Sequence, residues 1–251
     1  MDFSKYKVRC HTLGTFITDK TGKVANNKTS RNKIEEFFIF EKDKLKKRIS
    51  SPYFENGIAN EPAGLQLLND TIYNDGKTFV PKIKTRAEND YLTGETDCII
   101  GDTITDVKNA YNRYTFARAS LTGVYKWQGK GYLWIHEKPN FRLFYCLNNM
   151  PEYLVEKEIK SEFYKREFPF SWDDREFHQE FIDFELEQRE FYNYDDMELW
   201  ERFKTWDLQL EPGDTEIMIE AVTFVRNTMQ EMWADYEEHC NRNRRLMGIV
   251  D

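Results

Sequence analysis

The decisive stretch of this 251-residue chain reads Thr96-Asp97-Cys98-Ile99-Ile100-Gly101-Asp102-Thr103-Ile104-Thr105-Asp106-Val107-Lys108. Two runs of β-branched and apolar residues flank Gly101-Asp102, and a glycine at the first position of a two-residue loop favours a type II′ hairpin turn. This turn sets the pairs across the hairpin as Ile100 opposite Thr103, Ile99 opposite Ile104, Cys98 opposite Thr105 and Asp97 opposite Asp106.

The register brings two carboxylates together. Directly opposed residues on one face have Cβ atoms about 5 Å apart, and Lys108 shares the face of Asp106 because side chains alternate along a strand. Asp97 and Asp106 would destabilise a bare hairpin through their like charges. A divalent cation between them reverses that effect, since Mg²⁺ takes carboxylate oxygens. For this stretch alone, a solvated hairpin with two surface acids and a lysine is the alternative.

Two further segments extend the pattern. Upstream, Gly57 is followed four residues later by Glu61 and then by Pro62. Downstream, Gln128 and Tyr132 lie four residues apart and therefore share one face of the helix expected there. An ordinary polar–aromatic contact on a helix surface is the alternative for that pair.

With the hairpin, these segments resemble the PD-(D/E)xK nuclease superfamily, specifically its RecB, lambda-exonuclease and YqaJ-like branch. The positions that match the family's motifs, in the family's order, are Gly57, Glu61, Asp97, Asp106, Lys108, Gln128 and Tyr132. The resemblance covers about residues 50–150. It implies an α/β fold with a restriction-endonuclease-like core, in which helices flank a central mixed β-sheet, and the remaining sequence adds a C-terminal helical extension.

The resemblance also implies metal-dependent cleavage of DNA. An exonuclease is the leading interpretation, and a structure-specific or nicking endonuclease is the alternative. Phosphodiester hydrolysis needs an activated water and neutralised phosphate charge, and Mg²⁺ supplies both; Mn²⁺ is the alternative ion. The expected metal ligands are Asp97, Asp106, the backbone carbonyl of Val107 and, directly or through water, Glu61.

The other matched side chains receive supporting roles by the same resemblance. Lys108 is expected to orient or help deprotonate the attacking water and to offset phosphate charge; a nearby divalent cation that lowers its pKa would favour the base role. Gln128 and Tyr132 are expected to position water, Lys108 or the scissile strand through hydrogen bonds.

Partners follow from the same analogy of fold. Proteins of this branch often serve phage recombination or replication beside a single-strand annealing protein, so DNA and such a protein are the expected partners, and a homo-oligomer is left open. A non-catalytic DNA-binding or scaffold protein is the alternative outside enzymes. Four facing ionisable groups, Glu61, Asp97, Asp106 and Lys108, argue against it.

The charge is divided unevenly along the chain. Its net charge is −8, yet residues 1–130 contain 22 Lys+Arg and 16 Asp+Glu, whereas residues 131–251 contain 14 and 28. The basic part carries the motif, so DNA is expected there. The best candidates for contacts with the DNA backbone are Lys42, Lys44, Lys46, Lys47 and Arg48. A solvated helix end, favoured by the helix dipole, is the alternative for this run.

The pattern of apolar residues predicts the remaining elements. Helices are expected from about Thr29 to Leu45, over 53–69 with a kink or late start at Pro62, over about 116–134, and from about Thr215 to Arg245. Strands are expected over 78–86 and 141–147. We therefore expect a nuclease core at 1–150 and an acidic, aromatic-rich helical extension packed on it at 151–251.

Composition also bounds the location. The chain has no run of 18 apolar residues, so no membrane span is expected, and its N-terminus does not resemble a signal peptide. Four scattered cysteines argue against a zinc ribbon and against an iron–sulfur cluster. Reduced thiols in a cytoplasm, the host cytoplasm if the protein is phage-encoded, are the expectation.

Overall fold

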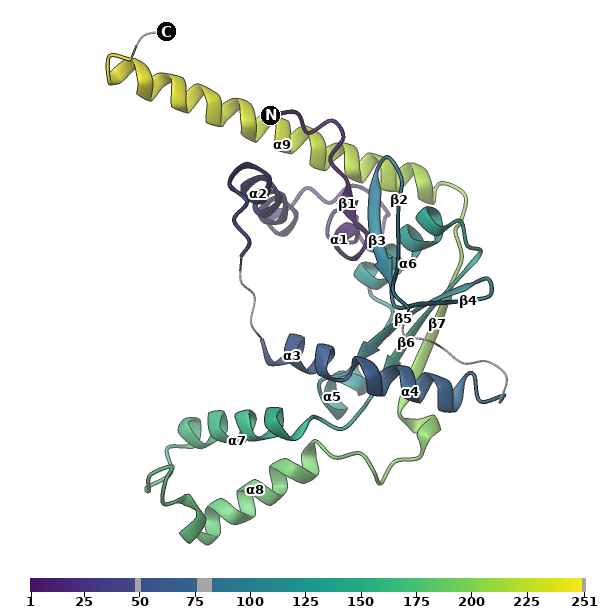
Figure 1. Ribbon diagram of the computed structural model, residues 1–251, viewed down its shortest axis with the longest axis vertical. Helices are drawn as coiled ribbons and strands as arrows, with labels where there is room; N and C mark the ends of the chain where they lie inside the picture. The colour runs from purple at the N-terminus through teal and green to yellow at the C-terminus, as the bar shows by residue number, and fades with distance from the viewer. Residues whose placement is uncertain (48–50, 76–82, 250–251) are drawn as a thin grey trace.

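A mixed four-stranded sheet forms the centre of the molecule (Figure 1). The computed structural model describes residues 1–47, 51–75 and 83–249. The strands of this sheet, in spatial order, are β4 (Cys98–Ile100), β5 (Thr103–Asn109), β6 (Asn140–Cys146) and β7 (Phe203–Leu208). Strand β5 runs antiparallel to β4 and parallel to β6, and β7 runs antiparallel to β6. A three-stranded sheet adjoins it, in the order β1 (Val8–Arg9), β3 (Leu92–Thr96) and β2 (Thr85–Glu88).

The helices surround these sheets. Their bounds are α1 Cys10–Leu13, α2 Lys28–Asp43, α3 Pro52–Ala59, α4 Glu61–Thr71, α5 Arg113–Ala117, α6 Gly123–His136, α7 Glu152–Arg166, α8 Gln179–Phe191 and α9 Asp214–Leu246, with 3₁₀ turns at Arg175–Phe177 and Leu199–Glu201. The helix expected over 53–69 is broken at Asn60, so that Glu61 is the first residue of α4. Pro62 explains the break, because proline is accommodated only in the first turn of a helix.

The predicted hairpin is confirmed in its turn and in three of its four pairs. Cys98, Ile99 and Ile100 face Thr105, Ile104 and Thr103 in the predicted register. Gly101 has a φ of +57°, while Asp102 is not left-handed. This is the pattern of a type II′ turn, which needs a positive φ at its first central residue alone.

Helices cover both faces of the four-stranded sheet. On one face α6 packs against the strands so closely that a Cβ on Gly129 would lie 2.6 Å from the ring of Phe141. Helix α9 joins this core through the following buried residues: Met218, Ala221, Val222, Val225 and Met229. On the opposite face α4 contributes Leu65 and Leu68, which pack with Val107 of β5. The predicted α/β core with a central mixed sheet between helices is confirmed.

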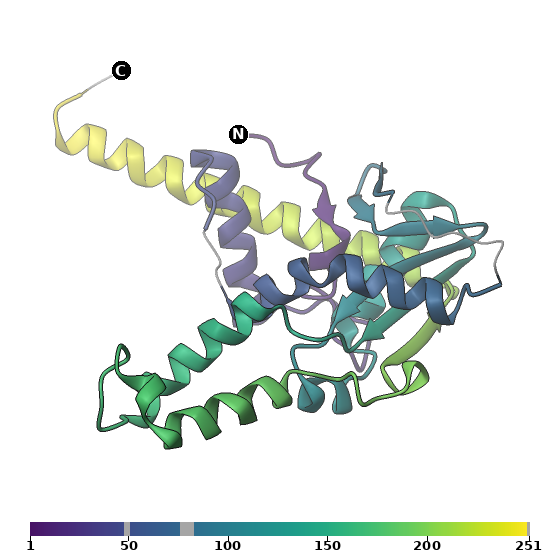
Figure 2. The same cartoon turned by 60° about the horizontal axis from the view of Figure 1, so that its bottom comes forward.

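A helical arm extends from this core. Helices α7 and α8 lie side by side and project away from the sheets (Figures 1 and 2). They enclose their own aromatic cluster, in which Phe163, Phe181 and Phe184 are buried. Helix α9 runs along the other side of the molecule against α2, and its last turns pass beyond it (Figure 1).

The extension predicted for 151–251 is not a separate helical unit. Strand β7 completes the central sheet, from Phe141 opposite Leu208 to Cys146 opposite Phe203, and α9 belongs to the same core as α6. The sequence did not predict β7, because an edge strand is half exposed and carries charged residues such as Lys204 and Asp207. Of the expected extension, residues 152–191 alone form the projecting arm.

Candidate active site

Asp97 lies where the chain passes from one sheet to the other. Strand β3 ends at Thr96 and β4 begins at Cys98, so Asp97 belongs to neither. Its Oδ2 accepts the backbone N–H of Val107 at 2.9 Å. Strand β4 pairs with β5 only as far as Thr105. Beyond that point the carboxylate of Asp97, and not a backbone carbonyl, accepts the N–H of Val107 on β5. The fourth predicted pair, Asp97 opposite Asp106, is thus not a ladder pair.

Asp106 is held from behind by α6. Its side chain points toward that helix and is almost fully buried, with 2% of the residue exposed. Gln128 donates from Nε2 to Asp106 Oδ1 at 3.2 Å and to the hydroxyl of Tyr132, also at 3.2 Å. Tyr132 in turn donates to the backbone carbonyl of Glu95 at 2.9 Å. Gln128 therefore holds Asp106 from the helix side, and Tyr132 holds Gln128.

Lys108 completes the group. Its Nζ lies 2.6 Å from Asp106 Oδ2, and its side chain is 29% exposed. Among the described residues, no hydrogen-bond donor of favourable geometry faces this buried Oδ2. The ammonium thus supplies a charge to Asp106 without satisfying its oxygen by a well-aligned bond.

These groups border a cleft of about 570 Å³. Asp97 and Lys108 line it, together with Glu61 from the first turn of α4 and Lys84 from the residue before β2. Gly57 lines the same cleft, and nothing lies within 4 Å of the position that its Cβ would take. The exposed apolar side chains on the α3 side of the cleft are Tyr53, Phe54 and Ile58.

Burial and a neighbouring charge perturb the pKa of Asp97. Burial first, and then the charge of Asp106, raise the pKa of Asp97 to about 6. Burial opposes the charge on Lys108, but Asp106 and Asp97 outweigh it and raise the pKa of that lysine. The two acids therefore favour the charged form of Lys108, and a base role needs a second cation nearby to reverse that preference.

Glu61 is engaged by a residue that sequence reasoning missed. Its Oε1 lies 3.2 Å from Nζ of Lys84, and a hydrogen bond from that lysine raises the pKa of Lys84. No motif spacing marks Lys84. Its position before a strand next to the carboxylates becomes visible only once β2, β3 and α4 are assembled.

The donor set fits a hard divalent cation in part. The acid pair, with one buried oxygen lacking an aligned donor, matches the preference of Mg²⁺ for carboxylate oxygens. In the described part of the chain, however, no three Asp, Glu, His or Cys side chains are gathered closely enough to hold a metal ion. The role of the Val107 carbonyl stays a prediction. The structure thus brings two of the predicted ligands, Asp97 and Asp106, close together, and Glu61 lies beside Lys84.

The basic run that begins at Lys42 lies at the C-terminal end of α2 and just after it. Lys42 pairs with Asp43 at 2.7 Å, Lys44 with Glu41 at 3.0 Å, and Lys47 with Glu36 at 3.2 Å. Lys46 is exposed, and Arg48 lies outside the described residues. Three of the predicted contacts to DNA are therefore tied to neighbouring carboxylates, and their role stays a prediction.

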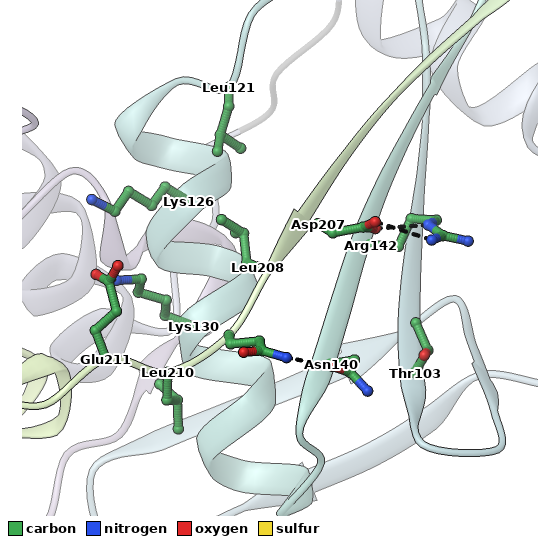
Figure 3. A pocket seen from close by; sticks show the side chains of 11 residues that line it. Thr103, Leu121, Lys126, Lys130, Asn140, Arg142, Asp207, Leu208, Leu210 and Glu211 are labelled. Atoms are coloured by element: carbon green, nitrogen blue, oxygen red, sulfur yellow. Dashed lines mark hydrogen bonds and ion pairs between the residues drawn. The ribbon is translucent and has the colours of Figure 1, made fainter.

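A larger hollow, of about 810 Å³, lies at the opposite end of the sheet (Figure 3). Thr103 and Asn140, at the start of β5 and β6, line it, whereas Lys108 lies near the other end of β5. Two of its charged groups have close partners: Arg142 pairs with Asp207 at 2.7 Å, and the buried Lys130 pairs with Glu211 at 2.8 Å (Figure 3). The smaller cleft holds Asp97, whose pKa burial and the neighbouring Asp106 raise, and we take this cleft as the candidate active site.

Comparison with known proteins places the fold. A phage-related exonuclease from Haemophilus somnus 129PT superposes with a TM-score of 0.69 at 17% identity, over 92% of this chain and 97% of that one. The chain shares the fold of an exonuclease. An alkaline exonuclease from Laribacter hongkongensis, LHK-Exo, gives 0.56 at 11% identity, over 97% and 96% of the two chains. LHK-Exo in complex with dAMP gives 0.56 at 12% identity, over 96% and 94%.

These neighbours agree with the resemblance drawn from the motifs. No family model matches the sequence, and a search of curated proteins finds no relative. In the described residues, no helix is long and apolar enough to cross a membrane.

Proposed function

We propose that the protein is a metal-dependent exonuclease acting on DNA. One observation carries this proposal. Asp97 and Lys108 line a cleft, and Asp106 lies 2.6 Å from Lys108. The fold that holds them is shared with phage-related and alkaline exonucleases. The match with a nuclease motif rests on residues, and the match in fold rests on the course of the backbone.

Each residue of the site has a separate role in this proposal. Asp97 and Asp106 would hold Mg²⁺, or Mn²⁺ in its place, with the Val107 carbonyl and Glu61 as further ligands. The metal would supply Lewis-acid charge at the phosphate and an activated water. Val107 fixes the Asp97 carboxylate through its N–H, and Gln128 fixes Asp106. Lys108 presents a charge from the same face and offsets the negative charge that develops on the phosphate.

Cleavage assays with purified protein test the proposal. Linear duplex, covalently closed circular and single-stranded DNA would each be incubated with Mg²⁺, with Mn²⁺ and with EDTA. We expect linear duplex to be degraded from its ends, circles to be spared, and EDTA to stop the reaction. Asp97→Asn and Asp106→Asn should remove cleavage while the circular dichroism spectrum stays that of the parent.

The same assays separate the alternatives. Rapid linearisation of supercoiled circles would favour a structure-specific or nicking endonuclease. Equal cleavage in EDTA and in Mg²⁺ would rule out the assigned acid pair. An inactive protein that still binds DNA would favour the scaffold interpretation.

We also propose the arm of residues 152–191 as the surface for a protein partner. It contains 13 Asp+Glu and 6 Lys+Arg, and Phe177 at its tip is 85% exposed. A single-strand annealing protein is the first candidate, and a second copy of the chain is the other. Light scattering of the protein alone and with an annealing protein, for the parent and for Phe177→Ser, distinguishes them.

We propose a cytoplasmic location. All four cysteines are free thiols, and free thiols are typical of a cytoplasm.

A further inference from the structure

The break between α3 and α4 is held by one residue, Asn60. Its N–H donates to the carbonyl of Asn56 at 3.0 Å and closes α3, and its carbonyl accepts the N–H of Gly64 at 2.9 Å and opens α4. The next residue is Glu61, which lines the cleft. The position of Asn60 therefore sets the point from which Glu61 leaves the helix.

The side chain of Asn60 does not cap the helix that follows it. An asparagine in this place usually accepts a backbone N–H of the first turn, but among the described residues Asn60 receives no such bond. Its Nδ2 instead donates to Oδ1 of Asn56 at 2.9 Å. Nδ2 of Asn56 then donates to the backbone carbonyl of Ala110 at 3.2 Å. Two amides in series thus connect the start of α4 with Ala110.

Ala110 continues the strand that carries Asp106 and Lys108. It directly follows β5, and its N–H donates to the carbonyl of Cys146 at 2.7 Å, which extends the pairing of β5 with β6. Lys108 lies two residues before it. The amides therefore join two parts of the cleft, the one that presents Glu61 and the one that presents Lys108.

Packing and hydrogen bonding fix different aspects of this contact. A Cβ on Gly64 would lie 2.8 Å from Cγ1 of Val107, so α4 cannot come closer to β5. That contact limits the approach of the helix but does not set its position along the strand. Hydrogen bonds are directional, and the bonds through Asn56 and Asn60 supply the missing restraint.

Both asparagines are buried, with 1% of Asn56 and 4% of Asn60 exposed. A buried amide destabilises a protein unless it is paired, whereas an apolar side chain would fill the same space without needing a partner. A paired network of buried amides gives one defined arrangement instead. This favours a role in geometry at the junction beside Glu61.

We propose that Asn56 and Asn60 are positioning residues, which place Glu61 relative to the part of the site on β5. This rests on the proposed function, in which Glu61 is a metal ligand. Neither asparagine touches the metal or the DNA. They hold the start of α4 at one position along β5, and Glu61 reaches the cleft from that position. Removing a partner that orients a metal ligand typically costs about 10- to 100-fold in metal affinity or activity.

Asn60→Ala tests the proposal through binding. It removes the donor to Asn56 and introduces a residue that a helix accommodates well. Calorimetric titration with Mn²⁺ in the absence of DNA should show a dissociation constant about tenfold higher than that of the parent. Anisotropy of a labelled duplex oligonucleotide in EDTA should show unchanged DNA affinity. A substitution that merely loosened the cleft would weaken both, and that result would overturn the proposal.

Asn56→Leu is the second variant. It removes both side-chain bonds of Asn56, so Mn²⁺ binding should weaken at least as much as in Asn60→Ala. Urea denaturation establishes that each variant is folded at the temperature of the titration. Parent-like Mn²⁺ binding in a folded Asn56→Leu or Asn60→Ala protein would contradict the proposed role.

A double-mutant cycle separates action through Glu61 from a general effect. Glu61→Gln should weaken Mn²⁺ binding by itself. If the amides act through Glu61, adding Asn60→Ala to Glu61→Gln should weaken binding no further, whereas independent effects would multiply. Multiplied effects, or unchanged binding in Glu61→Gln, would refute the proposal.

Asn149→Ala is the matched control. Asn149 also bridges two segments, because its Nδ2 donates to Asp195 and its Oδ1 accepts the N–H of Tyr194, both at 2.8 Å. It is not among the described residues that line the cleft, so Mn²⁺ binding should equal that of the parent. A loss comparable to that of Asn60→Ala would point to general loosening and count against the proposal.

The binding readouts also distinguish the two proposals. None of them needs cleavage. A parent protein that binds Mn²⁺ but cuts no DNA would refute the exonuclease alone. A parent protein that binds no Mn²⁺ would refute both.

Discussion

The two ends of the central sheet use the same chemical groups in different ways. At the hollow by the start of β5 and β6, the buried Lys130 has a close partner: Asp214 lies 2.7 Å away, and the two side chains are 2% and 6% exposed. At the cleft by the other end, Asp97 and Asp106 share one lysine, Lys108. The hollow is larger, about 810 Å³ against about 570 Å³. The raised pKa of Asp97 beside Asp106, and not the volume of the cavity, therefore locates the candidate chemistry.

The difference has an energetic meaning. A buried pair that is complete contributes to one fixed arrangement, and losing one partner is expensive. Two adjacent acids with too few partners destabilise the metal-free protein, and a cation removes that penalty. The hollow should thus respond to mutation through stability, and the cleft through activity and metal binding.

Lys108→Ala should give the largest effect at the cleft. The loss of a charge aimed at the reacting phosphate should reduce the cleavage rate by about 10²–10⁴-fold, with Mn²⁺ affinity retained. Lys108→Arg should not restore the rate, because the planar guanidinium differs in shape from a compact ammonium. Single-turnover cleavage of a linear duplex measures this. Lys126→Ala, which alters the hollow, is the control, and near-normal turnover in Lys108→Ala would refute the assigned role.

Lys130→Met should give the largest effect at the hollow. It leaves the buried Asp214 without its partner and should cost about 3–5 kcal/mol of unfolding free energy, measured by urea denaturation. Asp214 also accepts the backbone N–H of Glu211, so the start of α9 should loosen as well. Adding Asp214→Asn should recover part of the loss. A stability cost below about 1 kcal/mol would show that the two ends do not differ in this way.

Asp97→Asn should stabilise the metal-free protein at neutral pH. Its raised pKa of about 6 means that the folded state binds this proton more tightly than the unfolded state. The stability from protonated Asp97 is fully present below its ordinary pKa of 3.8 and is lost as pH rises through about 6. In EDTA at pH 8, the variant should gain about 1–2 kcal/mol over the parent.

The pH dependence gives the corresponding check. Between pH 8 and pH 5 the parent should become more stable relative to Asp97→Asn, until the difference disappears. In Mg²⁺ the order should reverse, because the metal then stabilises the carboxylate. A parent that loses stability relative to the variant on acidification would contradict the assigned charge imbalance.

Local patterns predicted the centre of the molecule well. The turn at Gly101, three pairs of the hairpin and the break at Pro62 all follow from backbone sterics within a few residues. The order of the motif residues predicted that Asp97, Asp106, Lys108 and Gln128 would meet. These features are local or repeated across related folds, so one sequence suffices to find them.

The features that the sequence did not predict depend on tertiary packing. Strand β7 is an edge strand with charged residues, and its pairing partner β6 lies far away in the chain. Lys84 meets Glu61 only because β2 and α4 lie at one cleft. The bend at Asp97 depends on where one sheet ends and another begins, which alternation along a strand cannot reveal.

The basic end of α2 should give the smallest effect. Removing one lysine that binds a phosphate should reduce the slope of log affinity against log salt by about 0.9 on duplex DNA. Lys46→Gln combined with Lys47→Gln should therefore lower the slope by at most about 1.8, and by less if Lys47 stays with Glu36. Anisotropy titrations between low and moderate salt measure it, with Lys126→Gln at the hollow as the control. Equal slopes in all three proteins would identify the run as a solvated helix end, and DNA binding would then depend on the cleft itself.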